Sequence, residues 1–241
     1  MLRLLLVLLS FVLCDAQALA KEVVRGSGRA ATEERGVSGF HAIAVSVPGR
    51  VTAIQGASEG ATLTADDNVL PKIVTVVDAG VLRIRFPHGV DVRPRTPIAN
   101  TVHGRSLDSF ETAGAVTVEV PRLEGKRLDA RLAGSGRIVL PELRLGTLSI
   151  RSSGHAHGLA IGRVDRFELG MAGSGEMNAA RLDAASASVH IAGSATAVVW
   201  VRERLEAGIT GSGSVRYFGD PGVRSRVAGS GRVRRMGASP P

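Results

Sequence analysis

The chain has 241 residues, a formal net charge of +8, and a hydrophobic fraction of 44% against an aromatic fraction of only 3%. The apolar content excludes an intrinsically disordered chain, and the single cysteine excludes zinc ribbons, iron–sulfur sites and disulfide scaffolds. Thirty glycines without a strict Gly-X-Y period exclude collagen.

Residues 1–20 have the layout of a cleaved secretory signal peptide. Arg3 precedes an apolar run from Leu4 to Cys14, and small-residue cleavage sites end at Ala18 and Ala20. The alternatives are an uncleaved anchor and a lipoprotein attached through Cys14, although the run is short for a membrane span. We therefore expect an exported protein, located in the periplasm, at the cell surface or in the medium.

The positive charge belongs to the mature chain, because Arg3 and Asp15 cancel within the signal. Such a charge attracts polyanions without specificity. For an exported protein we expect an anionic envelope polymer or glycan as the partner, while peripheral membrane contact and homo-oligomer formation stay open. Specific nucleic-acid binding is not expected, because aromatic side chains for base stacking are scarce.

Residues 21–106 are predicted to be an N-terminal β segment that caps the rest of the chain. Alternating apolar residues, typical of half-buried strands, occur in five stretches. These stretches are Phe40–Val47, Val51–Gln55, Ala61–Ala65, Ile73–Val77 and Val81–Phe86. Residues 87–106 contain Pro87, Pro94 and Pro97 with little periodicity, which predicts a loop.

Residues 107–235 contain a repeat of roughly 19 residues, marked by Gly-Ser-Gly triplets and near-copies of them. Each copy is predicted to form a strand, a tight corner and a second strand, and glycine suits the corner because it adopts positive φ freely. The corner serines are expected to hydrogen-bond between layers or to the corner backbone. The residues assigned to structural turns are Gly134, Ser135, Gly136, Gly154, Gly173, Ser174, Gly175, Gly193, Ser194, Gly211, Ser212, Gly213, Gly229, Ser230 and Gly231.

These observations predict an all-β protein in which residues 107–235 form a right-handed parallel β-solenoid with two strands in each coil. One copy buries too few apolar side chains to offset the ordering of about 19 residues, so the copies must stack. Residues 236–241 are predicted to be a flexible tail. The first outward position of the copies is predicted to form a solvated column without catalytic geometry, consisting of Asp129, Ser149, Glu168, Ser188, Glu206 and Arg224.

Several segments of the chain carry a family resemblance. They are the entrance Val37-Ser38-Gly39-Phe40, the Gly-Ser-Gly corners, and above all Leu205–Pro221 (LEAGITGSGSVRYFGDP) and Val227–Gly231 (VAGSG). These segments resemble the head GIN domain family, described as auto-transporter adhesins of bacteria. The resemblance covers residues 37–233 as one continuous domain. It implies a β-helical fold similar to pectin lyase, an envelope or secreted location and an adhesive role, and it implies no catalytic residues. The corners Gly154-His155-Ala156 and Gly193-Ser194-Ala195 depart from the pattern, which leaves their bend open.

No catalytic residue and no cofactor site is assigned from the sequence. Asp66-Asp67 is the adjacent acidic pair that stands out, and the residues after it predict a turn or short helix in preference to a catalytic role. His155 and His157 are weak candidates for metal ligands, because zinc prefers three or four converging ligands and no third is evident.

Two further groups are candidates for binding. Arg224, Arg226, Arg232 and Arg234 are candidate anion-binding residues, and the alternative is a solvated end of the stack that deters edge-to-edge pairing. Sugar binding usually employs exposed aromatic rings, for which Trp200, Tyr217 and Phe218 are the candidates, although Tyr217 falls on an inward position.

The leading hypothesis is a non-enzymatic, exported cell-envelope protein that serves as an adhesin-like surface-binding module. One alternative is a polysaccharide-active enzyme on the same scaffold, which would need clustered acidic side chains on one face. Another is a self-assembling structural unit of the envelope, in which the ends of the stack dock between copies.

Overall fold

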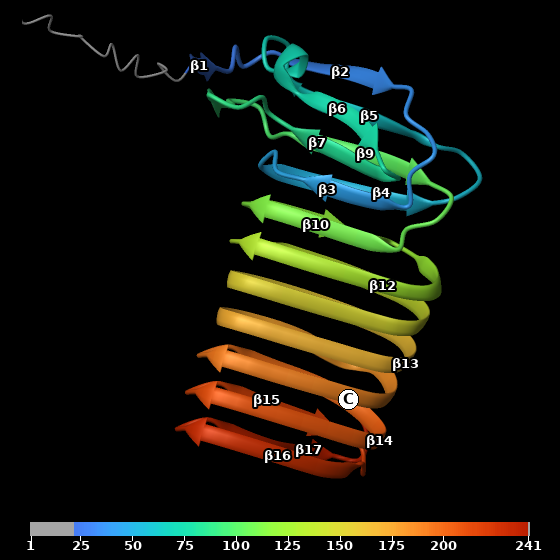
Figure 1. Ribbon diagram of the computed structural model, residues 1–241, viewed down its shortest axis with the longest axis vertical. Coiled ribbons are helices and arrows are strands. Elements are labelled where there is room, and N and C mark those ends of the chain that lie inside the picture. Colours follow the sequence, from blue (N-terminus) through green and yellow to red (C-terminus); the bar gives the residue numbers. More distant parts are fainter. Residues whose placement is uncertain (1–21, 241) are drawn as a thin grey trace, which may run out of the picture.

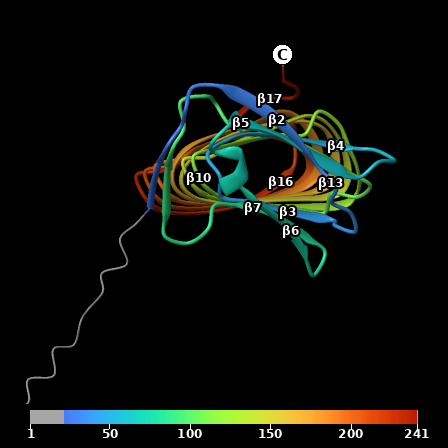
Figure 2. The same cartoon turned by 90° about the horizontal axis from the view of Figure 1, so that it is seen from above.

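The computed structural model describes residues 22–240, and the expected signal peptide at residues 1–20 lies outside this range. The chain winds into an elongated stack of strands, with the N-terminal segment at one end and the C-terminal strands at the other (Figure 1). Seen along the stack, the coils superpose as a flattened ring around the core (Figure 2). The predicted all-β parallel solenoid is confirmed.

The strands form two broad faces, called face A and face B below. Face A contains, from the N-terminal end of the stack onward, β6 (Val74–Asp78), β7 (Val81–Arg85), β3 (Ala42–Val45), β10 (Ser109–Gly114), part of β12 (Leu123–Gly134) and β16 (Gly222–Gly229). Face B contains β2 (Ala30–Arg35), β5 (Gly60–Asp66), β9 (Ala99–Gly104), β4 (Gly49–Gln55), β11 (Val116–Glu119), β15 (Ser214–Phe218) and β17 (Arg232–Gly237). The long strands β13 (Arg137–Gly193) and β14 (Thr196–Gly211) run around the coils and contribute to both faces, while β1 (Glu22–Arg25) and β8 (Val90–Arg93) form a separate parallel pair.

Equivalent positions of successive coils pair in parallel register, as the repeat predicts. Gly134 pairs with Gly154, and Gly211 pairs with both Gly193 and Gly229. The inward residues stack in the same way: Leu128 pairs with Leu148, and both are fully buried. The repeat read from the sequence is therefore one coil of the solenoid.

The first glycine of each corner lies against the carbonyl group of the corner before it. Gly134 and Gly154 have φ angles of +103° and +107°, and a Cβ placed on Gly154 would stand 2.5 Å from the Gly134 oxygen. Both the positive φ and the close approach require glycine. The two departing corners keep the stack intact, because Ala156 and Ala195 are buried at the position of the second glycine.

The corner serines contact the neighbouring layer mainly through the backbone, which corrects the expectation of hydroxyl contacts except at Ser174. The amide of Ser135 donates to the Gly114 carbonyl at 3.1 Å, and the amide of Ser194 donates to the Gly173 carbonyl at 2.9 Å. Within residues 22–240, Ser174 is the one corner serine whose hydroxyl has a side-chain partner, namely His155.

The parallel ladder begins before residue 107. β3 pairs in parallel with β7 and β10, and β4 pairs in parallel with β9 and β11, so the segment before residue 107 already contains coils of the stack. The predicted loop at residues 87–106 is wrong, because β8 and β9 lie within it. Asn100 occupies a buried position of β9 opposite Val51, which breaks the apolar alternation that would have indicated a strand.

The two ends of the stack differ. At the N-terminal end, β2, β5 and β6 form antiparallel pairs, and a short 3-10 helix (Leu70–Lys72) lies over the core with Val69 and Ile73 buried in it (Figure 2). At the other end, β16 and β17 have no outer partner strand among residues 22–240, and β17 extends into the predicted tail. In the same range, no helix has the length and hydropathy needed to span a bilayer.

Candidate functional site

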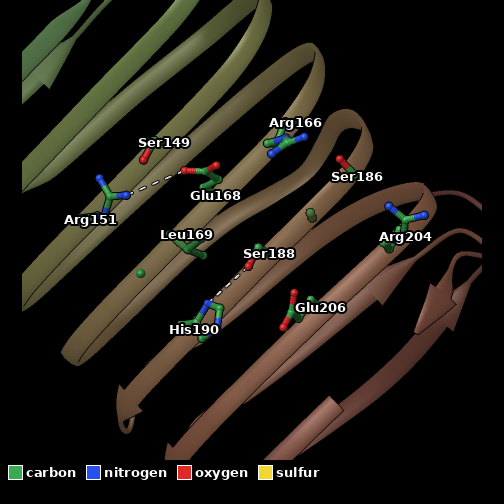
Figure 3. Close-up of a pocket in the computed structure, with 12 residues that line it drawn as sticks. Ser149, Arg151, Arg166, Glu168, Leu169, Ser186, Ser188, His190, Arg204 and Glu206 are labelled. Carbon is green, nitrogen blue, oxygen red and sulfur yellow. Dashed lines mark hydrogen bonds and ion pairs between the residues drawn. The ribbon is translucent and has the colours of Figure 1, made fainter. Parts of the chain in front are cut away.

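The candidate site is a groove of about 590 Å³ on the outer surface of face A, over the middle and C-terminal coils (Figure 3). Its walls come from four successive coils within β13 and β14, so residues far apart in sequence line one surface. The polar residues that line it are Ser149, Arg151, Arg166, Glu168, Ser186, Ser188, His190, Arg204 and Glu206.

Charged and hydroxyl side chains alternate from coil to coil along this face. Coils that carry an arginine and an acid two residues later are separated by coils that carry two hydroxyl residues. In stacking order the pairs are Arg127 and Asp129, Thr147 and Ser149, Arg166 and Glu168, Ser186 and Ser188, and Arg204 and Glu206. Because neighbouring strands are about 4.8 Å apart, like charges recur only about every 10 Å, which limits their repulsion.

The N-terminal part of the face uses its charges internally. The Asp129 side chain is 12% exposed and lies 3.1 Å from Arg127, 3.4 Å from Arg151 and 3.6 Å from Arg131. Arg151 is shared, because it also lies 3.9 Å from Glu168 at the edge of the groove. This network stabilises the stack and leaves little charge for a ligand.

Farther along the groove, toward the C-terminal end of the stack, the charges lack partners. Among residues 22–240, no hydrogen bond or ion pair engages the side chains of Arg166, Arg204 or Glu206. Guanidinium groups in this state can bind carboxylate, sulfate or phosphate groups in bidentate fashion. The arrangement therefore offers two cationic anchors about 10 Å apart, with hydroxyl groups between them.

The serines of this face differ from the solvated column that the sequence predicts. Ser149 is fully buried and its hydroxyl has no partner among the described residues. The Ser188 hydroxyl lies 3.4 Å from Nδ1 of His190, whose ring stands at the lower end of the groove (Figure 3). The predicted solvated face is thus wrong at its centre, where the side chains form a recess.

A second hollow of about 590 Å³ continues the groove toward the corners and shares Arg151, Gly170 and His190 with it. Glycine keeps this region open. A Cβ on Gly208 would stand 2.9 Å from the His190 ring, and one on Gly170 would stand 3.7 Å from Arg151. Arg151 and His190 are thus each followed, in the next coil, by a glycine that leaves the outward position without a side chain.

The structure brings His155 and His157 together at a corner. Their Nε2 atoms are 3.0 Å apart, and Nδ1 of His155 lies 2.9 Å from the Ser174 hydroxyl. No group of three or more His, Cys, Asp or Glu side chains suited to a metal occurs in the part of the chain that the structure describes. Among residues 22–240 the pair therefore has no third protein ligand of these types, and His190 lines the groove of face A.

The acidic pair Asp66-Asp67 ends β5 and begins the turn that leads to the short helix, as predicted. Asp66 is fully buried and accepts hydrogen bonds from the amides of Gly28 and Arg95 and from Thr96. Burial raises the pKa of Asp66, but these hydrogen bonds outweigh it and hold the pKa below its usual range. The carboxylate joins three segments of the N-terminal end and lies outside the groove of face A.

Of the aromatic candidates, Trp200 and Phe218 are partners in the ladder between β14 and β15, whereas Tyr217 falls on the inward side. Tyr217 and Phe218 are half-buried, and Tyr217 packs against the core. Trp200 lines a separate groove of about 450 Å³, beside the ion pairs that Asp183 makes with Arg163 at 3.1 Å and with Arg202 at 2.8 Å. The four arginines proposed for anion binding all lie on β16 and β17, exposed, at the C-terminal end of the stack.

Residues 39–221 match the model of a family described as "Putative auto-transporter adhesin, head GIN domain". No curated protein matches the sequence. A solved "putative adhesin" from Bacteroides fragilis has a TM-score of 0.84 at 21% identity, covering 88% of this chain and 100% of that one. A "Putative lipid binding protein" from Parabacteroides distasonis has a TM-score of 0.71 at 26% identity, covering 89% and 100%. A "putative adhesin" from Parabacteroides merdae has a TM-score of 0.73 at 22% identity, covering 89% and 99%.

Proposed function

The chain belongs to the head GIN domain family of auto-transporter adhesins, and on this premise we propose that it is a non-enzymatic, exported envelope protein that binds an acidic polysaccharide along the groove of face A. The family indicates an exported or surface protein. Export through a cleaved signal at residues 1–20, and a working place in the periplasm or at the cell surface, are part of the proposal.

The observation that carries the proposal is the pair Arg166 and Arg204 in one groove without protein partners among the described residues. Two guanidinium groups about 10 Å apart match a chain that presents acidic groups at intervals, better than a single small anion. The serine hydroxyls supply donors and acceptors for the hydroxyl groups of the same polymer. A polysaccharide with carboxylate groups offers both kinds of partner.

The alternative of an enzyme rests on Glu168 and Glu206, which lie two coils apart and hence about 10 Å from each other. This is close to the separation of roughly 6.5–9.5 Å between the acids of inverting glycosidases. A general acid, however, keeps its proton at neutral pH through burial in apolar surroundings. Glu206 is exposed and Glu168 is half-buried beside Arg151, so binding without cleavage is the better-supported role.

The test measures binding of polygalacturonate, with neutral dextran as the reference polymer, to the purified protein at physiological salt. We expect polygalacturonate to bind without chain shortening, and R166Q/R204Q to weaken binding by about tenfold or more, because charged hydrogen bonds contribute roughly 1.5–3 kcal/mol each. The control R137Q/R181Q removes the same charge from exposed positions outside the groove and should bind within about twofold of the parent.

If both double variants lost the same affinity for polygalacturonate, net charge alone would explain the effect, and the groove would not be the binding site. Polymer shortening that disappears in E206Q would establish the enzyme instead. Light scattering on the same sample separates the third alternative, since a self-assembling unit would form particles that grow with protein concentration.

A further inference from the structure

The last coil of the solenoid exposes apolar side chains at positions where the coil before it buries them. By register, Val223 and Val227 of β16 stack on Leu205 and Ile209, which are 0% and 2% exposed. Val223 and Val227 themselves are 38% and 44% exposed, because no further coil covers them among the described residues. The end of the stack therefore presents an apolar centre.

Arginines surround this apolar centre. The same register places Arg224 and Arg226 of β16, and Arg232 and Arg234 of β17, on the outward side of the last coil. Arg235 turns back, with its Nε donating to the Gly219 carbonyl at 2.8 Å. Residues 221–241 contain five arginines and no acidic residue, so this segment contributes only positive charge.

The negative groups that face this cluster come from the coil before it. Asp220 lies 3.5 Å from Arg235, and Glu206 stands opposite Arg224 in the ladder without an ion pair to it. Among residues 22–240, Asp220 is therefore the one carboxylate that forms an ion pair with an arginine of this segment. The remaining arginines point away from the stack at its edge, where an external anion has access.

A second copy of this chain is a poor occupant for such a surface. Two C-terminal ends placed together would bring two arginine clusters into contact, and like charges destabilise an interface. The N-terminal end of another copy offers no open coil among the described residues, because β2, β5, β6 and the helix over the core close it. Charge complementarity instead favours a flat, negatively charged partner that also accepts shallow apolar side chains.

We propose that the C-terminal end of the solenoid docks onto the surface of a bilayer that contains anionic phospholipids. Guanidinium groups bind lipid phosphates in bidentate fashion, while Val223, Val227 and Met236 enter the interfacial layer. The unpaired amide groups along the edges of β16 and β17 face the same layer, where phosphates and water accept hydrogen bonds. In this pose the solenoid stands upright, and the groove of face A stays open to the side.

The test is co-sedimentation of the purified protein with vesicles of phosphatidylglycerol and phosphatidylcholine, against vesicles of phosphatidylcholine alone. We expect binding to the first, loss of binding at high salt, and little binding to the second. Removing two arginines in R224Q/R226Q should weaken binding by about 25-fold, since each arginine near an anionic surface contributes about fivefold. R224K/R226K should retain most of the affinity.

Matched variants keep the proposal falsifiable. R137Q/R181Q has the same net charge as R224Q/R226Q, and equal binding by the two would overturn the proposal by reducing it to net charge. V223S/V227S should bind less tightly with an unchanged salt dependence. An absence of binding to phosphatidylglycerol vesicles, or a concentration-dependent dimer in light scattering that V223S/V227S abolishes, would also overturn it. R166Q/R204Q separates this site from the groove, because it should impair polygalacturonate binding more than vesicle binding.

Discussion

The carbonyl oxygen of Gly134 lies against the α-carbon of Gly154, so closely that a Cβ on Gly154 would stand 2.5 Å from it. The same contact recurs between Gly211 and Gly229 near the C-terminal end, which makes it a property of the stack and not of one corner. Each corner glycine thus permits the bend of its own coil and also allows the neighbouring coil to approach closely.

Gly154→Ala should therefore lower the free energy of unfolding by about 2–3 kcal/mol, because it combines a left-handed backbone with displacement of a neighbouring carbonyl. Urea denaturation followed by circular dichroism measures the change. Gly56→Ala is the control, since a Cβ on Gly56 would meet no heavy atom within 4 Å, and it should change stability by less than about 0.5 kcal/mol. Similar losses in both variants would contradict the stacking argument.

Asp129 holds three guanidinium groups near one nearly buried carboxylate. Asp129→Ala should lower the free energy of unfolding by about 1.5–3 kcal/mol, because it leaves Arg127 and Arg151 without their shared partner. Glu206→Ala, at the equivalent position of a later coil, removes a side chain that has no ion pair among residues 22–240 and should be close to neutral. Equal effects from both changes would show that the network does not stabilise the stack.

Asp66 predicts how the N-terminal end responds to acid. Its pKa is lowered in the folded state, so its contribution to stability is present above the unfolded value of about 3.9 and is lost as the pH falls through the folded pKa. Asp66→Asn should accelerate amide exchange around Gly28 and Thr96 at neutral pH, and the difference from the parent should shrink below about pH 4. Hydrogen exchange with mass spectrometry resolves these segments.

The control for this measurement is Asp165→Asn, because Asp165 is exposed and lies in a coil far from the N-terminal end. It should leave exchange around Gly28 unchanged across the same pH range. A difference between Asp66→Asn and the parent that grows in acid would contradict the lowered pKa.

Glu206→Gln should strengthen binding of polygalacturonate by about threefold, because it removes a carboxylate that repels the polymer over a distance of roughly 5 Å in water. The Arg204 anchor is untouched by this change. Calorimetric titration at two salt concentrations measures the gain, which should shrink at the higher one. A weaker complex would mean that Glu206 accepts essential hydrogen bonds from the ligand.

The period of the solenoid could be read from the sequence because it follows from local properties. Alternation around Leu128 and Leu148 marks the buried face, and glycine at each corner marks the bend. Strand β9 could not be predicted in this way, because Asn100 fills a core position and no local rule distinguishes it from a loop residue. The groove could not be predicted from the sequence either, although arginine alternates with serine at equivalent positions of successive copies.

By itself, the sequence determined the coil length, the inward residues and the corners, since backbone preference and apolar periodicity act within a few residues. Only the tertiary structure decided which outward charges find partners. Arg151 reaches Asp129 of the preceding coil at 3.4 Å while Arg166 reaches no acid among the described residues, because side chains from coils about 20 residues apart meet only through the stack. The register between β13 and β14 also shifts near Ala184, and no local pattern in the sequence encodes this shift.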